Sequence, residues 1–153
     1  MEWDRGYTLG LLHDSGRLAL LTANPVAYNR LLQVGAPDAR QMLTMENELF
    51  GVDHCQLAEC LADQWRLPPG LGSAMAHHHD PYGSDARAPV LIVQMACRLA
   101  DMAGFPAWGD APPWNLDDLQ EHLPRSSAER LNPETLIPWL VERINGLEGA
   151  LMH

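Results

Sequence analysis

Three short stretches of the chain place histidines and carboxylates next to each other: His13-Asp14, Asp53-His54 and the run 77–80, which is His-His-His-Asp. Imidazole nitrogens and carboxylate oxygens together form ligand sets that suit Mn, Fe, Zn or Ni. A bound ion of this kind lowers the pKa of a coordinated water and so provides a nucleophile at neutral pH. These residue types favour a metal site, with metal-assisted hydrolysis as the chemistry it would support.

A structural interpretation of the same residues stays open. The pair His13-Asp14 would then close a helix at the surface, and the run 77–79 would be a solvated loop. His54 would be a polar residue near a helix N-terminus. The acidic residues nearby are most simply a solvated helix face, although Glu46 or Glu48 also suits a partner that orients a metal-bound histidine.

The elements that position these residues are expected to be helices. Apolar residues recur at intervals of three and four, and no stretch alternates as a strand would. The first helix should end at His13-Asp14, with Gly16 as the break. Further helices are expected at 17–23, from Pro25, from Pro37 to Gly51, at 53–65, at 89–103, and in the tail from Asn132. Asp53 and Gln56 have the spacing of a capping box, and Trp65 ends an apolar stripe that begins at His54.

Composition limits the partners. The 153 residues carry a net charge of −10, and all ten basic residues are arginine. An acidic surface argues against nucleic acid or an anionic membrane as the main partner. No apolar run reaches about 18 residues, so no transmembrane helix is expected. No secretory leader is expected from the residues at the N-terminus, and the three cysteines fit neither a disulfide framework nor a zinc motif, so a cytoplasmic protein with reduced thiols is expected.

Five stretches together resemble a known family. They are, in order, Leu9–Arg17 (LGLLHDSGR), Asn24–Tyr28 (NPVAY), Glu46–His54 (ENELFGVDH), Leu61–Pro68 (LADQWRLP) and His78–Pro81 (HHDP). Over roughly residues 7–104 the chain resembles the HDOD family of the HD superfamily, and in particular the C-terminal, HD-like part of its domain. The resemblance implies an all-α, HD-domain-like helical bundle. We expect residues 1–110 to form this core and 111–153 to be a helical extension that packs on it.

The resemblance also implies a set of metal ligands. His13 and Asp14 match the doublet that gives the HD superfamily its name, His54 matches the next histidine, and His78 and His79 match a later pair. The family's last ligand is an aspartate, and Cys97 stands at its position. Asp101, four residues further on, is a weaker candidate for this role. The implied cofactor is one divalent transition metal: Mn, Fe, Zn or Ni.

Three functions follow from the resemblance. HDOD proteins are bacterial signalling modules generally regarded as non-catalytic, so the first is a module that binds a protein partner, a second copy of itself or a small ligand. Since the family's N-terminal half has no counterpart here, the chain is either a short version or a piece of a longer protein, and self-association would cover an apolar face. The second is an HD-type phosphohydrolase acting on a phosphoester or a (cyclic di)nucleotide. There Asp14 would act at the metal, and Arg17 would clamp a phosphate. The third is a metal that only joins helices.

Overall fold

The computed structural model describes residues 2–68, 70–81, 88–107 and 132–151, and within these ranges the chain forms helices and turns without any strand. The predicted all-α class is therefore confirmed. The chain divides into two compact units, Met1–Ala96 and Cys97–His153. The predicted boundary near residue 110 lies outside the described residues, so the division into a core at 1–110 and an extension at 111–153 stays a prediction.

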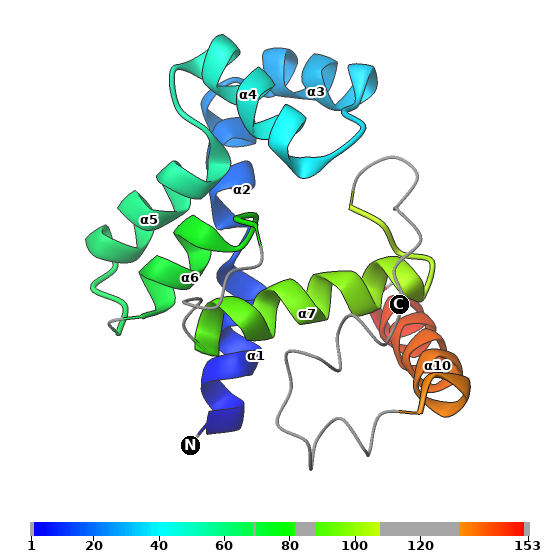
Figure 1. Cartoon of the computed structure of the whole chain (residues 1–153). Helices are drawn as coiled ribbons and strands as arrows, with labels where there is room; N and C mark the ends of the chain where they lie inside the picture. Colours follow the sequence, from blue (N-terminus) through cyan, green and yellow to red (C-terminus); the bar gives the residue numbers. More distant parts are fainter. Residues whose placement is uncertain (1, 69, 82–87, 108–131, 152–153) are drawn as a thin grey trace. The chain divides into compact units, whose positions relative to one another are not determined.

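Among the described residues, the first unit contains six helices and the start of a seventh, labelled in Figure 1. They are α1 (Glu2–Leu12), α2 (Ser15–Ala23), α3 (Pro25–Val34), α4 (Ala39–Phe50), α5 (His54–Gln64), α6 (Leu71–His77) and the start of α7 (Ala88–Met102). The second unit contains the end of α7 and α10 (Pro133–Leu151), which Asn132 caps and which continues through Pro138. None of the helices in the described part is long and apolar enough to cross a membrane.

Polar caps start two helices of the first unit, α3 and α5, where the sequence predicts these helices to begin. The side chain of Asn24 accepts a hydrogen bond from the backbone of Ala27 at the start of α3, with Pro25 as its first residue. Asp53 and Gln56 form the expected capping box at the start of α5. Such a box satisfies two backbone N–H groups that a helix end otherwise leaves exposed, so it fixes where α5 begins.

Helix α5 lies at the centre of the first unit, where it packs against α2 and α6. Ala58 and Ala62 face this contact and are almost completely buried. Gly16 was expected to be a break, but it is buried within α2, and the chain turns earlier, at His13-Asp14. A Cβ atom on Gly16 would lie 1.9 Å from the backbone oxygen of His54, so the glycine is there for close helix packing.

The apolar stripe of α5 is shorter than the sequence indicates. Trp65 is 52% exposed, whereas Ala58 is fully buried. The residue caps the C-terminal end of α5, where the backbone leaves the helix through Arg66 at a positive φ of 53°. A helical pattern identifies the face on which a residue lies, but it does not tell how far along the helix the neighbours reach.

Candidate metal centre

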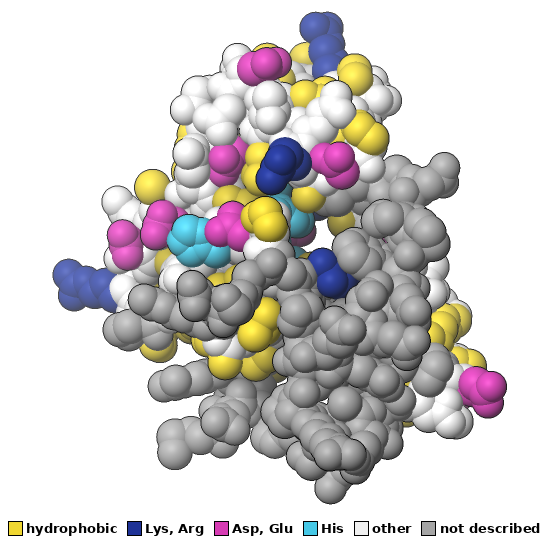
Figure 2. Space-filling view, in the orientation of Figure 1, with side chains coloured by type: hydrophobic (Ala, Val, Ile, Leu, Met, Phe, Trp, Pro, Cys, Tyr) yellow, Lys and Arg dark blue, Asp and Glu magenta, His cyan; other side chains and the backbone are white. Residues whose placement is uncertain are grey.

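The predicted ligands come together from three places in the first unit. His13 and Asp14 form the turn between α1 and α2, His54 is the first residue of α5, and His78 and His79 follow directly after α6. Because α5 packs on both α2 and α6, these positions converge. In the space-filling view of this unit, histidine and acidic side chains gather next to each other on one face (Figure 2).

The carboxylate of Asp14 is the centre of this group. Its Oδ1 lies 3.4 Å from Nε2 of His78 and 3.6 Å from Nε2 of His54, and its Oδ2 lies 3.7 Å from Nε2 of His13. Two ligand atoms bound at about 2.1 Å to one tetrahedral ion lie about 3.4 Å apart. The distance from each imidazole to the Asp14 carboxylate is therefore close to that between two ligands of one metal ion.

Each of these three imidazoles is held through its other nitrogen. Nδ1 of His13 lies 2.8 Å from the backbone oxygen of Gly10, and Nδ1 of His78 lies 2.7 Å from that of Met75. Nδ1 of His54 lies 2.6 Å from the Glu46 carboxylate. A proton on Nδ1 that is shared with an acceptor leaves the lone pair on Nε2, which is how proteins orient histidines that bind metal. All three Nε2 atoms then face Asp14.

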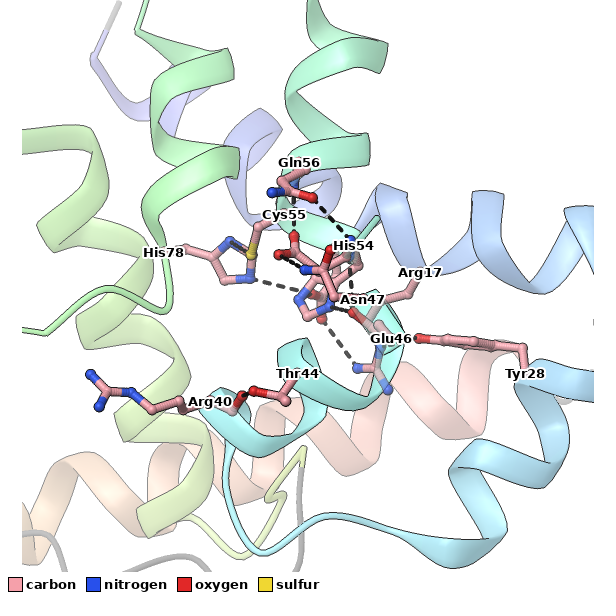
Figure 3. A network of polar contacts seen from close by, with 12 residues as sticks. Arg17, Tyr28, Arg40, Thr44, Glu46, Asn47, His54, Cys55, Gln56 and His78 are labelled. Atoms are coloured by element: carbon pink, nitrogen blue, oxygen red, sulfur yellow. Dashed lines mark hydrogen bonds and ion pairs between the residues drawn. The ribbon is translucent and has the colours of Figure 1, made fainter. Parts of the chain in front are cut away.

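Glu46 forms a buried network behind the site (Figure 3). Its side chain is fully buried and accepts hydrogen bonds from the backbone N–H of His54 (2.9 Å), from its ring and from the hydroxyl of Tyr28 (2.9 Å). Burial alone would raise the pKa of Glu46, but the hydrogen bonds and charge of His54 lower it, so the carboxylate is ionised. Burial and the neighbouring carboxylate of Glu46 raise the pKa of Tyr28 to about 12, despite the opposing effect of Arg17.

Arg17 connects this network back to Asp14. Its Nε donates to the Tyr28 hydroxyl at 3.3 Å, and its guanidinium lies 3.4 Å from Oδ2 of Asp14. Although burial opposes the charge on Asp14, the neighbouring His78, His13 and Arg17 hold the pKa of this carboxyl far below its ordinary value. The site thus has an ionised carboxylate at any physiological pH.

Two of the histidines, His79 and His13, have lowered pKa values. Burial, followed by the charge of His78 and His54, lowers the pKa of His79 to about 3. Burial also lowers the pKa of His13, against the opposing effect of Asp14. A neutral imidazole is the form that binds metal, so the environment favours the ligand state over the protonated state.

These residues fit a metal ion chemically as well as geometrically. Oδ1 of Asp14 and Nε2 of His78 are buried and face each other at 3.4 Å, and among the described residues neither makes a regular hydrogen bond, so an ion between them would satisfy both. Two groups of donors have all their ligand atoms within 4.8 Å of one another: His13, Asp14 and His78, and also His54, Cys55, His78 and His79. Nitrogen and oxygen donors in this mixture suit Mn, Fe, Zn or Ni.

A pocket of about 320 Å³ adjoins the site on the side of α1, α2 and α3. Asp14, Ser15, Arg17 and Tyr28 supply its polar wall, and leucines supply the rest: Leu11, Leu18, Leu21 and Leu32. Asp14 therefore belongs both to the metal cluster and to the pocket. A ligand in this pocket would meet a guanidinium and an aliphatic surface within reach of the cluster.

The sequence identified five residues that the structure brings together: His13, Asp14, His54, His78 and His79. Whether they bind metal stays a prediction. Their neighbour His77 instead pairs with Asp80 at 2.8 Å, and its side chain is 53% exposed. Cys97 and Asp101 belong to the second unit, outside the unit that carries the cluster, so the role of Asp101 as a ligand also stays a prediction.

The structure corrects the interpretation of the acidic residues. It also places two further residues, Tyr28 and Cys55, in contact with residues of the site. Glu46 is buried beside His54, as its alternative role required, and does not lie on a solvated face. The sequence placed Tyr28 on a helix and gave it no role at the site, whereas its hydroxyl binds Glu46. Cys55 is buried in the core, as cysteines commonly are, and its Sγ also lies beside His78. Tyr28 lies within the family-like stretch NPVAY, which was the only signal for it in the sequence. Nothing in the sequence separated Cys55 from the other two cysteines.

The helices of the first unit place a His-Asp doublet, a further histidine and a histidine pair around one carboxylate. This arrangement defines a module related to the HD superfamily. The chain belongs to the HDOD family: the model of the HDOD domain matches residues 1–81, which is more than half of its length. The match does not show which part of the family's domain these residues represent, so correspondence to its C-terminal part stays a prediction.

One relative is an uncharacterized protein of Treponema pallidum (strain Nichols), 26% identical over 125 residues. The aligned part covers 78% of this chain but 22% of that protein, so the chain spans less than a quarter of the relative's length. No solved structure matches the chain significantly.

Proposed function

We propose that this chain is a bacterial signal-transduction module of the HDOD type that holds one divalent transition metal at the Asp14 cluster. It acts by binding a protein partner or a small ligand rather than by catalysis. The observation that carries the proposal is the arrangement of three imidazoles, each anchored at Nδ1, with every Nε2 directed at one ionised carboxylate. When bound, the ion would supply Lewis acidity and activate a coordinated water. A cytoplasmic location remains a prediction from the sequence.

The residue at position 97 favours binding over catalysis. Cys97 stands where the resemblance expects the last aspartate, so the family's ligand set is incomplete at that position. Metal-ligand distances tolerate errors of only about 0.2 Å. A carboxylate one helical turn after Cys97, that of Asp101, therefore does not replace the missing aspartate ligand.

An exposed apolar surface on α1, α2 and α3 supports a macromolecular partner. Large hydrophobic side chains project from these helices into solvent: Tyr7, Leu11, Leu18, Val26, Leu32 and Val34. Three of them, Leu11, Leu18 and Leu32, line one pocket, and a large exposed apolar patch marks a site of association. Sedimentation of the chain alone, and with Leu18→Glu as the variant, tests self-association: we expect a mass above the monomer that this substitution reduces. A monomer at all concentrations would leave a different protein as the partner.

The first experiment is the metal content of freshly purified, untagged protein by plasma mass spectrometry, followed by reconstitution with Mn, Fe or Zn. We expect about one ion per chain in the native protein, and its loss in Asp14→Asn, because this carboxylate faces all three imidazoles. Asp80→Asn is the matched control, since this exposed acid pairs only with His77 among the contacts described. Less than about a tenth of an ion per chain after reconstitution would refute a functional metal site.

A second candidate function is an HD-type phosphohydrolase, favoured by Arg17. Its guanidinium lines the pocket 3.4 Å from Asp14, where it would form a two-point contact with a phosphate next to the ion. Metal-loaded protein that hydrolyses bis(p-nitrophenyl) phosphate, with turnover lost in Asp14→Asn and Arg17→Gln, would establish the enzyme. Metal binding without turnover supports the binding module. A purely structural metal is distinguished by a chelator that lowers the melting temperature in the absence of any ligand or substrate.

A further inference from the structure

A thiol lies inside the histidine cluster. Cys55 is 5% exposed, and its Sγ lies 3.8 Å from Nδ1 of His78. His54, Cys55, His78 and His79 each offer one ligand atom within 4.8 Å of the others, and three of these residues are buried and the fourth is half-buried. This group contains no carboxylate, in contrast to the group of His13, Asp14 and His78.

Local structure fixes the thiol in place. His54 and Cys55 open α5, and the capping box of Asp53 and Gln56 holds this first turn. His78 and His79 follow the last turn of α6, the helix that packs against α5. The four donors therefore come from two helix ends that are held against each other, as in sites formed by a rigid framework.

The chemistry of the two groups differs. One thiolate and three imidazoles form a soft, four-coordinate set of the kind that binds Zn²⁺. A set that contains a carboxylate suits Mn²⁺ better, because this ion prefers oxygen ligands. Both groups include His78, whose Nδ1 is held by the backbone oxygen of Met75. Only its Nε2 is then available, and one ion at a time can bind it.

We infer that Cys55 is a metal ligand and that His54, Cys55, His78 and His79 form a site for a thiophilic divalent ion such as Zn²⁺, as an alternative to the Asp14-centred coordination. On binding, the Cys55 thiol loses its proton to the solvent and a sulfur–metal bond forms, with no change in oxidation state. The inference shares His54 and His78 with the three imidazoles on which the proposed function rests, but it adds Cys55 as a ligand and a metal preference that the proposed function does not require.

The test uses Co²⁺ as a spectroscopic substitute for Zn²⁺ in the reduced, metal-free full chain. A cobalt–thiolate bond gives a charge-transfer band in the near ultraviolet that imidazole and carboxylate ligands do not give. We expect this band in the wild type, its loss in Cys55→Ser and its retention in Cys60→Ser, where the exchanged thiol is exposed. Absence of the band in the wild type, or its survival in Cys55→Ser, would overturn the inference.

Two further variants keep the test independent of folding and of the proposed function. The double variant Cys60→Ser, Cys97→Ser leaves Cys55 as the only thiol, so the band must persist in it. Asp14→Asn must keep the cobalt–thiolate band while it loses Mn²⁺, whose binding is followed by electron paramagnetic resonance. If Mn²⁺ binds at Asp14 but no cobalt–thiolate band appears, the inference is refuted and the proposed function stands. A cobalt–thiolate band with no Mn²⁺ binding refutes the Asp14-centred site and leaves the inference standing.

Discussion

Replacement of Gly16 by alanine tests whether the contact between α2 and α5 positions the metal ligands. A Cβ atom at this position would lie 1.9 Å from the backbone oxygen of His54, 2.8 Å from its carbonyl carbon and 3.0 Å from the backbone nitrogen of Ala58. These are backbone atoms, so no side chain can rotate away. The first distance must grow to at least 3.0 Å, which requires a displacement of 1.1 Å or more between α2 and α5.

The displacement has a consequence for stability and a larger one for the site. Overpacking of this kind costs roughly 1–3 kcal/mol, and the better helix propensity of alanine offsets about 1 kcal/mol of this, so we expect a net loss of about 0–2 kcal/mol. His54 moves together with its carbonyl, whereas Asp14 stays with α2. Since metal sites tolerate about 0.2 Å, a shift of this size should weaken metal binding by at least about tenfold, or 1.4 kcal/mol.

The assay is urea unfolding for stability and chelator competition for metal affinity. Gly6→Ala is the matched control because the new methyl group at Gly6 meets nothing within 4 Å, although the residue also lies in α1, the helix that leads to the site. It should raise stability by up to about 1 kcal/mol and leave the metal Kd unchanged. If Gly16→Ala binds metal with the wild-type Kd, α5 is not held by this contact and the reasoning fails.

Three other perturbations address the buried network and the histidines. Glu46→Gln removes the charge that anchors His54, so the metal Kd measured by chelator competition should rise about 10–100-fold; an unchanged Kd would show that the anchor is irrelevant. Tyr28→Phe should lower the free energy of unfolding in urea by about 1 kcal/mol, because a buried hydrogen bond to Glu46 is lost, whereas the exposed Tyr7→Phe should change nothing. His79 has a folded-state pKa of about 3 and an unfolded value near 6.5, so between these pH values the unfolded chain binds more protons and metal-free stability should rise with pH. His79→Gln should reduce that slope by up to about 1.4 kcal/mol per pH unit in unfolding curves measured across this range, and a slope equal to that of the wild type would contradict the assignment.

The helices and their starts could be predicted because their signals are local. Asn24, Asp53 and Gln56 act within one helical turn, so the sequence alone shows where α3 and α5 begin. Gly16 could not be interpreted in this way. In a sequence, a glycine is equally compatible with a helix break and with a close contact between helices. Only the structure distinguishes the two, because His54, from a helix 38 residues later, approaches Gly16.

The ligands of the candidate site were predictable from a motif, but the thiol among them was not. Neighbouring residues on a helix point about 100° apart, so His54 and Cys55 are expected to face different surroundings. They share a cluster because the end of α6 lies across the first turn of α5, so that His78 meets Cys55 as well as Asp14. Packing between two helices decides this, and no spacing within one segment contains that information.

The three anchors of the imidazoles explain which part of the site is most vulnerable. Gly10 and Met75 hold His13 and His78 through backbone oxygens three residues earlier in the chain, so each anchor forms as soon as its own helical turn forms. The anchor of His54 is different, because Glu46 comes from another helix and is charged, buried and shared with Tyr28. It exists only when α3, α4 and α5 are packed together. A change in the packing of α3 would therefore reach the cluster through Tyr28, by way of Glu46 to His54 and by way of Arg17 to Asp14, which gives a binding module a physical route from its surface to its metal.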